Sequence, residues 1–430
     1  MALPKAKQDA LEARLDAAPR PEGGKWITAA RDDARARLTA MGLPGKRDEY
    51  WRYTDPTGFN APAPAPAALF SGVPEALPFE AIERVRLVFV DGVFDAAQSD
   101  RPELAGVEIT RLAEAAQVDI HWARDLYGVL ETRGQTPVQR PFAALNTAFA
   151  QDGVLIRVTG KAARPVSLVY LHGDETSDAV LHHVIRLEPG AEMTLLENGP
   201  GAARLNKVLE VDVADGARFH HVRTMGRDHQ RRAITHIFAR LGTESVFKSF
   251  TMTSNGRMTR NEAVIELTGD DAIAHVAGAA VGDGDFHHDD TVFITHAAER
   301  CESRQVYKKV LKNGATGVFQ GKILVKSGAQ KTDGYQISQS LLLDGDSNFL
   351  AKPELEIYAD DVKCSHGSTS GAMDETALYY LRSRGVPKAE AEGLLVLAFL
   401  AEAIAEIEDE ALAEEVRARV ESWLARHKTA

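Results

Sequence analysis

The chain has 430 residues, of which 44% are hydrophobic and 26% are charged, and it carries a formal net charge of −12 at pH 7. This composition is typical of a folded globular protein rather than of a disordered or fibrous one, and the negative charge argues against a general affinity for nucleic acid. The N-terminus lacks the apolar segment of a signal peptide, and the most apolar run, at 394–401, is too short to span a bilayer. We therefore expect a cytoplasmic protein with no membrane segment.

The N-terminal part of the chain is predicted to be helical up to about residue 55. Residues 25–42 carry apolar side chains near helical spacing and end at Gly42, a residue type that commonly terminates helices. A proline-rich stretch at 61–69 then interrupts the pattern, and its composition favours a linker or an extended edge segment. We therefore predict an N-terminal helical region with its linker over residues 1–70.

Short β-like runs bounded by Gly, Asp and Asn follow from Val85 to about residue 366, so strands are predicted to dominate there. Within this part, four turn glycines recur at intervals of 26, 26 and 27 residues: Gly190, Gly216, Gly242 and Gly269. Glycine permits the positive φ of tight turns, and a steady interval is typical of the stacked coils of a parallel β-helix. A β-sandwich is the competing interpretation, but its turns recur about every 8 to 12 residues. We favour a mainly β fold with a parallel β-helix core over residues 71–370.

The apolar pattern changes to helical spacing after Gly371. Residues 373–385 predict a short helix closed by Gly385, and Pro387 stands where a new helix could begin. Apolar residues then recur at i, i+3 and i+4: Leu397, Leu400, Ile404, Ile407, Leu412, Val416, Val420 and Trp423. We predict a C-terminal helical domain over residues 371–430, with two or three helices. Its acidic run from Glu402 to Glu415 is predicted to be a solvated face, or alternatively a docking surface for a partly basic partner.

Two segments in the strand region are weak candidates for binding sites. Residues 313–328 lack the spacing and the hydroxyl residue of a Walker A loop, so we predict strand and turn there and no ATP site. Residues 286–296 hold several metal-ligand types, but strand alternation places His288 and Asp290 on one face and His287 and Asp289 on the other. These histidines are predicted to be mostly structural, as are the adjacent pairs His182–His183 and His220–His221.

The stretch "DVKCSHG" at 361–367 is the stronger candidate. The chain has only two cysteines, Cys301 and Cys364, which we expect to be free thiols in a reducing compartment, with Cys301 serving only to pack. If the strand of "ELEIYADDV" continues through this stretch, Cys364 and His366 share one face with Cα atoms about 7 Å apart, and could bind one soft metal ion. Two protein ligands do not complete a tetrahedral site, so further ligands would come from another chain or a transient cargo. The alternative is a buried cysteine with a capping histidine.

Several long segments of the sequence are similar to the SufB/SufD family, the scaffold subunits of the Suf iron–sulfur cluster assembly machinery. The resemblance is carried by residues 144–158, 306–345 and, most specifically, 352–386, with a weaker match at 42–55. It covers nearly the whole chain. Within the family the chain resembles the SufD-type branch most, because SufB-type chains tend to be longer and often carry an N-terminal cysteine motif that is absent here.

The resemblance implies a right-handed parallel β-helix flanked by helical N-terminal and C-terminal domains. It also implies a non-enzymatic scaffold in a complex of one SufB, two SufC and one SufD subunit. The β-helix would pair with that of SufB, the C-terminal helices would dock SufC, and SufC would supply the ATPase activity. The isolated chain could also form a homodimer.

The resemblance further implies a site at the SufB interface. In SufD-type proteins the histidine of the "CSHG" motif is regarded as part of a nascent cluster site, together with a cysteine from SufB. This assigns His366 as a ligand of transient iron or of an iron–sulfur cluster, with Cys364 as a neighbour whose role is less defined. The family complex is also associated with reduced flavin, but no segment here shows a flavin fingerprint.

Two other functions are compatible with the residues alone. A stand-alone β-helix enzyme acting on carbohydrate would need two acids in a cleft about 5 to 10 Å apart, and the sequence by itself places no such pair. A protein-interaction solenoid would have no metal role.

Overall fold

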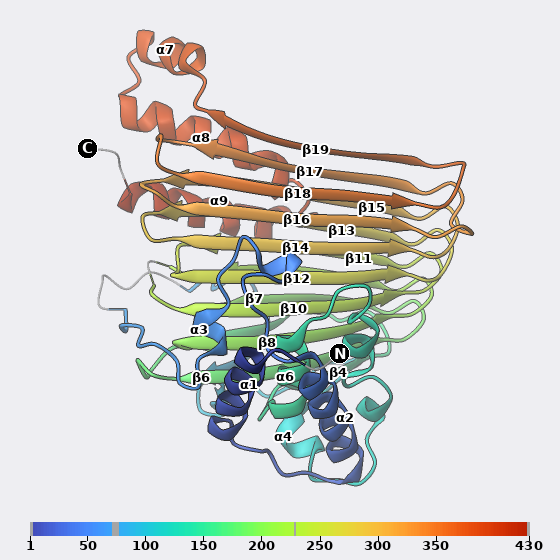
Figure 1. Cartoon of the computed structure of the whole chain (residues 1–430). Helices are drawn as coiled ribbons and strands as arrows, with labels where there is room; N and C mark the ends of the chain where they lie inside the picture. Colours follow the sequence, from blue (N-terminus) through green and yellow to red (C-terminus); the bar gives the residue numbers. More distant parts are fainter. Residues whose placement is uncertain (1–2, 71–76, 228, 428–430) are drawn as a thin grey trace.

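In the computed structural model, which describes residues 3–70, 77–227 and 229–427, successive strands from residue 154 to residue 372 alternate between two facing sheets. Each sheet therefore stacks every second strand of the chain in parallel, and the backbone winds through both sheets as a flattened solenoid (Figure 1). Neighbouring coils are in register, for example Arg232 beside Arg204. The predicted parallel β-solenoid is confirmed, and the β-sandwich alternative is wrong.

The strands of the described chain form one sheet of ten strands and one of nine. The ten-stranded sheet contains β1 (Val85–Val90), β2 (Val93–Phe94), β5 (Val166–Leu171), β7 (Glu192–Asn198), β9 (Arg218–Met225), β11 (Val246–Ser254), β13 (Ile273–Asp283), β15 (Glu302–Lys312), β17 (Asp333–Leu342) and β19 (Lys363–Ala372). The nine-stranded sheet contains β3 (Val107–Arg111), β4 (Val154–Val158), β6 (Asp178–Leu187), β8 (Arg204–Val213), β10 (Arg232–Leu241), β12 (Met258–Leu267), β14 (His287–His296), β16 (Thr316–Val325) and β18 (Asn348–Ile357). The pairs β1–β2 and β3–β4 are antiparallel.

Inward-facing side chains of the two sheets form the main hydrophobic core. Because side chains alternate along a strand and the coils are in register, one position of each coil forms a row along the solenoid. Phe219 and Phe247 are neighbours in such a row, with ring centroids 5.5 Å apart, and neither is exposed to solvent. Burial of one such side chain contributes roughly 1.5–3 kcal/mol, so continuous apolar rows hold the coils together.

The four repeat glycines satisfy two different requirements. Gly190 and Gly216 adopt positive φ values of 70° and 66°, as a tight turn requires. Gly242 and Gly269 lie outside the positive-φ region, so the turn argument does not apply to them. A Cβ atom at Gly269 would instead lie 2.0 Å from the backbone nitrogen of Thr243 in the preceding coil. In these coils the close stacking of neighbouring turns, rather than backbone conformation, requires glycine.

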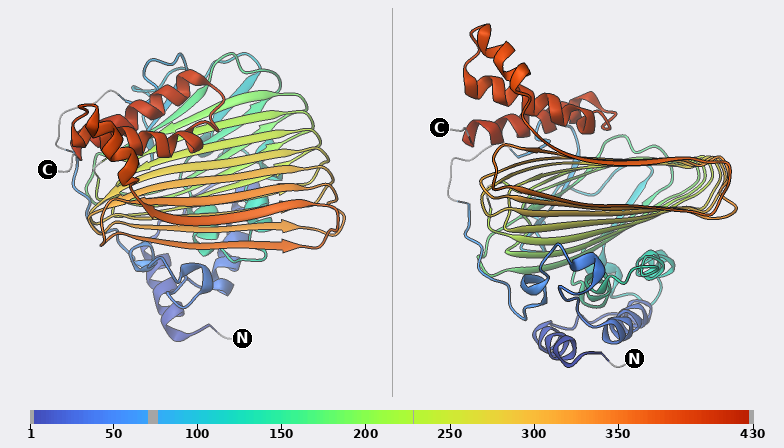
Figure 2. Two further views of the ribbon diagram at one scale, coloured as in Figure 1. Left: turned by 90° about the horizontal axis from the view of Figure 1, so that it is seen from above. Right: turned by 45° about the horizontal axis from the view of Figure 1, so that its top comes forward.

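The helices that precede β4 cover the outer face of the nine-stranded sheet (Figure 2). They are α1 (Lys5–Ala17), α2 (Lys25–Met41), η1 (Glu49–Trp51), α3 (Thr57–Asn60), α4 (Leu112–Ala115), η2 (Trp122–Asp125), α5 (Val129–Arg133) and α6 (Pro141–Phe149). The predicted helix at 25–42 is confirmed, since α2 is followed by Gly42 with a φ of 67°. Residues 64–70 form neither helix nor strand. The predicted domain boundary after residue 70 adjoins residues 71–76, which lie outside the described residues.

The prediction that strands dominate from Val85 onward is wrong for residues 112–149, where four short helical segments stand between β3 and β4. The last of them, α6, begins with Pro141 in its first turn, where the missing N–H breaks no helical hydrogen bond. Every residue of α6 is buried, between α2 and the sheet. Its sequence therefore lacks the polar face that marks an amphipathic helix.

Three helices follow β19 in the described chain: α7 (Glu375–Ser383), α8 (Lys388–Ile404) and α9 (Glu410–Arg426). Helices α8 and α9 lie on the outer face of the ten-stranded sheet, whereas α7 projects beyond β19 (Figures 1 and 2). The predicted apolar stripe is buried in this contact, with Leu400 and Val416 packed in one cluster with Phe250 of β11. The predicted C-terminal helices and the stop at Gly385, with a φ of 87°, are confirmed.

Candidate functional site

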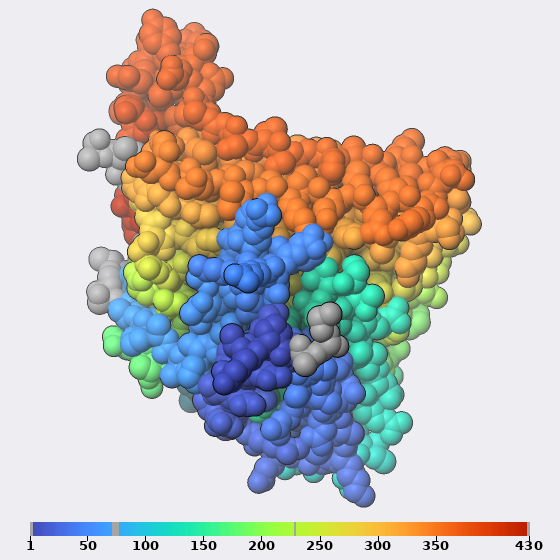
Figure 3. Space-filling view, in the orientation of Figure 1, coloured from blue at the N-terminus to red at the C-terminus, as the bar shows by residue number. Residues whose placement is uncertain are grey.

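The last coil of the solenoid leaves two strand edges uncovered by another strand. β18 is the final strand of the nine-stranded sheet and β19 is the final strand of the ten-stranded sheet, and both lie at the same end of the molecule. In the space-filling view this coil forms the upper surface of the solenoid (Figure 3). Exposed edges of this kind offer unpaired backbone groups to a further strand.

The two edges differ in what they offer. Alternate residues of a parallel strand bond to the same neighbour, and the Lys363 N–H donates to Thr332 of the preceding turn at 2.8 Å. The intervening residues of β19 therefore direct their N–H and C=O groups to the free edge: Cys364, His366, Ser368, Ser370 and Ala372. On β18 the Asn348 N–H bonds inward, to Ala315 at 2.9 Å, so Pro353 falls on the free edge. Because proline has no N–H, the row of backbone donors along the edge of β18 is interrupted at Pro353, whereas the row along the edge of β19 is continuous.

Cys364 and His366 lie in β19, but the predicted route of the chain to them is wrong. β18 ends at Ile357, a turn follows, and Lys363 begins a new strand in the opposite sheet. The pair therefore does not continue the strand of "ELEIYADDV", and residues 367–371 after it belong to β19 itself. The predicted alternation holds within β19, which places both side chains on the face directed toward the other sheet.

His366 caps an inward-facing row of the solenoid at its open end. It is in register with Gln336 of β17, which is in turn in register with Gln305 of β15. Both glutamines are fully buried, and the Gln336 side chain donates to that of Gln305 at 2.8 Å. His366 is itself exposed because no coil covers it. Its imidazole is therefore accessible to a group approaching the open end.

Cys364 occupies the neighbouring inward position and is half-buried. It packs at the margin of a small apolar cluster that includes Ile323 and Ala359. Burial raises the pKa of the Cys364 thiol, although a backbone hydrogen bond from Gly334 opposes the shift. The thiol is therefore mainly protonated near neutral pH, and a metal ion would have to displace its proton.

Among the residues that the structure describes, no group of three or more His, Cys, Asp or Glu side chains is placed to hold a metal ion. Cys364 and His366 lie together as two neighbouring ligand types on one strand face. Their assignment as metal ligands stays a prediction. Cys301 is buried, and its thiol donates to the Gly269 carbonyl at 3.3 Å.

An N-terminal segment holds β18 in place near the open end. The Tyr50 hydroxyl donates to Glu354 of β18 at 2.5 Å, and Lys352 lies 2.6 Å from Glu49. The Lys352 ammonium also lies over the Tyr50 ring, 4.0 Å from its centroid. Glu49 and Tyr50 belong to the weaker family match at 42–55, so that segment has a structural role beside the candidate site.

The other candidate histidines have partners inside the protein, as predicted. His182 contacts Glu210 at 2.9 Å, His183 contacts the Tyr170 hydroxyl at 3.0 Å, and His221 contacts Ser249 at 2.8 Å. Burial lowers the pKa of His183 to about 3. His183 and His221 are therefore neutral, and all three imidazoles serve as hydrogen-bonding groups of the core.

The cluster at 286–296 is split between two faces, as strand alternation predicted. His287 and Asp289 face outward and share Thr54, at 3.0 and 2.6 Å. His288 and Asp290 face the interior and contact Lys309, at 2.9 and 2.5 Å. Both halves are therefore engaged in different internal networks.

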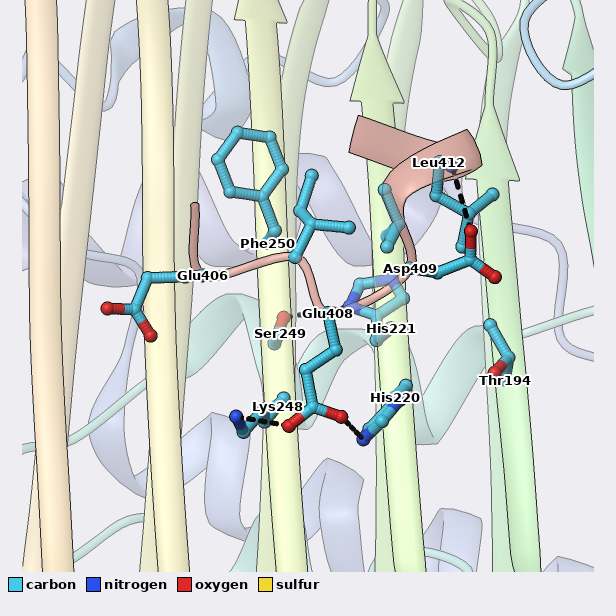
Figure 4. A pocket seen from close by; sticks show the side chains of 12 residues that line it. Thr194, His220, His221, Lys248, Ser249, Phe250, Glu406, Glu408, Asp409 and Leu412 are labelled. Atoms are coloured by element: carbon cyan, nitrogen blue, oxygen red, sulfur yellow. Dashed lines mark hydrogen bonds and ion pairs between the residues drawn. The ribbon is translucent and has the colours of Figure 1, made fainter. Parts of the chain in front are cut away.

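The acidic run after Glu402 is not simply a solvated face. In the pocket between the α8–α9 turn and the sheet, Glu408 lies 2.5 Å from Lys248 and 3.1 Å from His220 (Figure 4). Glu406 lies 3.0 Å from His275, and Glu402 pairs with Lys308. The sheet supplies the bases that the run itself lacks. Part of the acidic run therefore fixes the helices to the solenoid instead of being free for a partner.

Sequence reasoning missed two buried ionic networks. One lies beneath the N-terminal helices, where Arg140 and Arg260 lie 2.8 and 2.7 Å from Glu262. Although burial opposes it, the charges of Arg260 and Arg140 lower the pKa of Glu262 to about 2. The other lies inside the solenoid and involves Lys207 and Arg223. The register neighbours of these charged residues are themselves mostly polar, as with Thr235 beside Lys207 and Glu197 beside Arg223. The sequence therefore carries no apolar pattern around these positions that would mark them as buried.

No helix of the described chain has both the length and the apolar character needed to cross a bilayer.

Comparison with known proteins identifies relatives over most of the chain. A family model described as "SUF system FeS cluster assembly, SufBD core domain" matches residues 170–399. The iron–sulfur cluster assembly protein SufD of Escherichia coli is 29% identical over 419 residues, which cover 93% of this chain and 93% of that protein. An iron–sulfur cluster assembly SufBD family protein of Synechocystis is 26% identical over 409 residues, covering 88% and 86%. SufD of Bacillus subtilis is 29% identical over 297 residues, covering 66% and 67%.

Proposed function

Since the chain belongs to the SufB/SufD family of iron–sulfur cluster assembly proteins, we propose that it is the SufD-type scaffold subunit of a Suf complex. It pairs with a SufB-type scaffold, binds a SufC-type ATPase and carries no catalytic activity of its own. Iron or a nascent cluster is its transient cargo rather than a resident cofactor. The solenoid is right-handed in this proposal, as the family resemblance implies.

The observation that carries the proposal is the pair of open strand edges at one end of the solenoid. Native proteins usually cover or interrupt such edges, because they template the addition of another strand. Here β18 is interrupted by Pro353, but the edge of β19 is continuous. A second solenoid that meets this end supplies the missing strand and buries the inward side chains of the last coil.

The same contact completes the metal site. His366 is exposed at this end and Cys364 lies beside it, so a partner that covers β19 faces both side chains. A cysteine contributed by the partner would add a further soft ligand, which suits iron and sulfide. Because the ligands must lose their protons to bind, cluster formation is expected to weaken as the pH falls.

The C-terminal helices provide the surface for the ATPase. None of the residues of α7 is buried, and it carries Tyr379 and Tyr380 with 74% and 55% of their surface exposed. Exposed aromatic side chains of this kind are typical anchors of protein interfaces. Since parts of the acidic run are already paired with the sheet, the docking surface centres on α7 rather than on the α8–α9 turn.

No step is assigned to reduced flavin. In the described chain, strands lead directly into helices after β3 and after β19, and neither junction carries a glycine-rich turn that would cradle a phosphate at a helix N-terminus.

Reconstitution with the partner subunits tests the function. We expect a His366→Ala variant to retain association with both partners and to lose cluster formation. Ser365→Ala, on the same strand with its side chain on the opposite face, is the matched control and should behave like the native protein. Normal cluster formation by the His366 variant would contradict the site assignment. Purification as a monomer that cleaves polysaccharide would contradict the scaffold function altogether.

A further inference from the structure

The interior of the solenoid carries an excess of positive side chains. Lys207 of β8 pairs with Glu197 of β7, and Lys309 of β15 contacts Asp290 of β14 at 2.5 Å. Each of these contacts joins the two sheets, so the side chains lie between them. Two buried arginines lie in the same interior. The cations and carboxylates of this interior in the described chain are Lys207, Arg223, Arg231 and Lys309 against Glu197 and Asp290, which leaves two positive charges uncompensated.

The uncompensated charges belong to the two arginines. Arg223 donates to the Thr235 hydroxyl and the Asn261 side-chain oxygen, each at 3.0 Å. Arg231 donates to the Asn255 carbonyl and the Thr259 hydroxyl, each at 3.4 Å. All four acceptors are neutral, and no carboxylate of the described residues forms an ion pair with either guanidinium.

Neighbouring histidines do not change this balance. His183, His221 and His288 face the same interior, and burial lowers the pKa of each, so they are neutral near pH 7. Burial and the excess of positive charge also lower the pKa values of the cations themselves. Burial lowers the pKa of Lys207 to about 8 despite the opposing charge of Glu197. Burial and the charge of Arg223 lower the pKa of Arg231 to about 10.

A small cavity adjoins Arg223 and Lys207. Its inward-facing lining includes Tyr170, Glu197 and Thr235, and it has room for about one water-sized particle. The Arg223 Nε atom is buried and has no hydrogen-bond partner. The carboxylate beside Arg223 is that of Glu197, its register neighbour on β7, and it already pairs with Lys207. One carboxylate thus serves two buried cations, which is destabilising, and here an unpartnered donor and a space for a ligand occur together.

We infer that this cavity binds one small monovalent anion of halide size, which lies between Arg223 and Lys207 and serves as the counter-charge that Arg223 lacks. The size of the cavity excludes polyatomic anions such as sulfate, and the carboxylate of Glu197 disfavours a second negative charge. The anion joins both sheets through the two cations. The stability of the folded chain therefore depends on the anion that is present.

Bromide is the probe for this site, because it replaces chloride and has an anomalous X-ray signal. Crystals of the full chain soaked in sodium bromide are expected to show an anomalous peak in the cavity beside Arg223. In solution, the melting temperature in sodium bromide should exceed that in sodium gluconate at equal ionic strength, because an ion that binds only the folded state stabilises it. Density for water alone without an anomalous signal, or equal melting temperatures in the two salts, would overturn the inference.

Two variants sharpen the solution measurement. Arg223→Met removes the cation, so the difference between bromide and gluconate should disappear. Arg240→Met is the matched control, since Arg240 pairs with Asp212 on the outer face at 2.9 Å, and it should keep the full difference. If the Arg223 variant retains the bromide effect, the cavity is not the site. If that variant does not fold, the anomalous map of the native protein decides alone.

Discussion

Replacement of Ser368 by proline should block pairing at the open end without unfolding the solenoid. The N–H of Ser368 faces the free edge of β19, so its loss leaves the β17–β19 ladder intact. The alternate residues from Cys364 to Ala372 can each offer backbone groups to a partner strand, and each hydrogen bond contributes about 0.5–1.5 kcal/mol net. Proline removes one donor and its ring obstructs the adjacent contact, so we expect a loss of about 1–3 kcal/mol. The dissociation constant of the scaffold pair should then rise about 5- to 150-fold.

Calorimetric titration of the chain with its SufB-type partner measures this change. Ser368→Ala is the control, because it loses only the 3.1 Å contact between the Ser368 and Ser338 hydroxyls and keeps the N–H. Thermal unfolding of each variant alone verifies that the solenoid is folded. If the folded proline variant binds the partner as tightly as the alanine variant does, the β19 edge is not the pairing surface.

Three further predictions concern single side chains. Cys364 should react with iodoacetamide more slowly than a free cysteine at pH 7, and faster as the pH rises, because burial raises the pKa of its thiol. Rapid alkylation at pH 7, measured by mass spectrometry, would contradict this. His183 stays neutral in the folded state, whereas the unfolded chain binds a proton there below about pH 6.5, so the free energy of unfolding should fall by about 1.4 kcal/mol per pH unit as the pH decreases toward 3. Urea unfolding of His183→Gln should show a weaker dependence of this free energy on pH, and an unchanged dependence would refute the assignment. Tyr50→Phe should lower the free energy of unfolding by about 1–2 kcal/mol and accelerate amide hydrogen exchange in β18, because Glu354 loses its hydroxyl donor. The surface pair Tyr358–Glu356 provides the control, since Tyr358→Phe should change neither quantity.

The architecture could be predicted because the solenoid repeats its local signals. Turn glycines at a nearly constant interval reveal stacked coils, and the apolar stripe of residues 397–423 reveals helices that pack on one face. Both features follow from backbone periodicity, which appears in the sequence as a regular spacing of residue types. The alternation of β19 likewise follows from strand geometry once the strand is known.

Features that depend on contacts between distant segments could not be predicted in this way. Helix α6 is buried on all sides, so its apolar run carries no helical period. In "ELEIYADDV" the alternation is broken only by the pair Asp360–Asp361, in the turn between β18 and β19. Two residues do not show that the next strand lies in the opposite sheet. Lysine and arginine are residue types usually found on the surface, and only the stacking of neighbouring coils shows that Lys207 and Arg223 face inward. Whether a residue faces the interior of a solenoid depends on the register of coils about 26 to 32 residues away.

The central claim is that His366 binds iron at a site shared between two scaffolds. X-ray absorption at the iron edge, recorded on the reconstituted complex loaded with iron, tests it most directly. The native complex is expected to show multiple scattering from an imidazole ring, and the His366→Ala complex is expected to lack it while still containing all subunits. Identical imidazole scattering in both complexes would contradict the account.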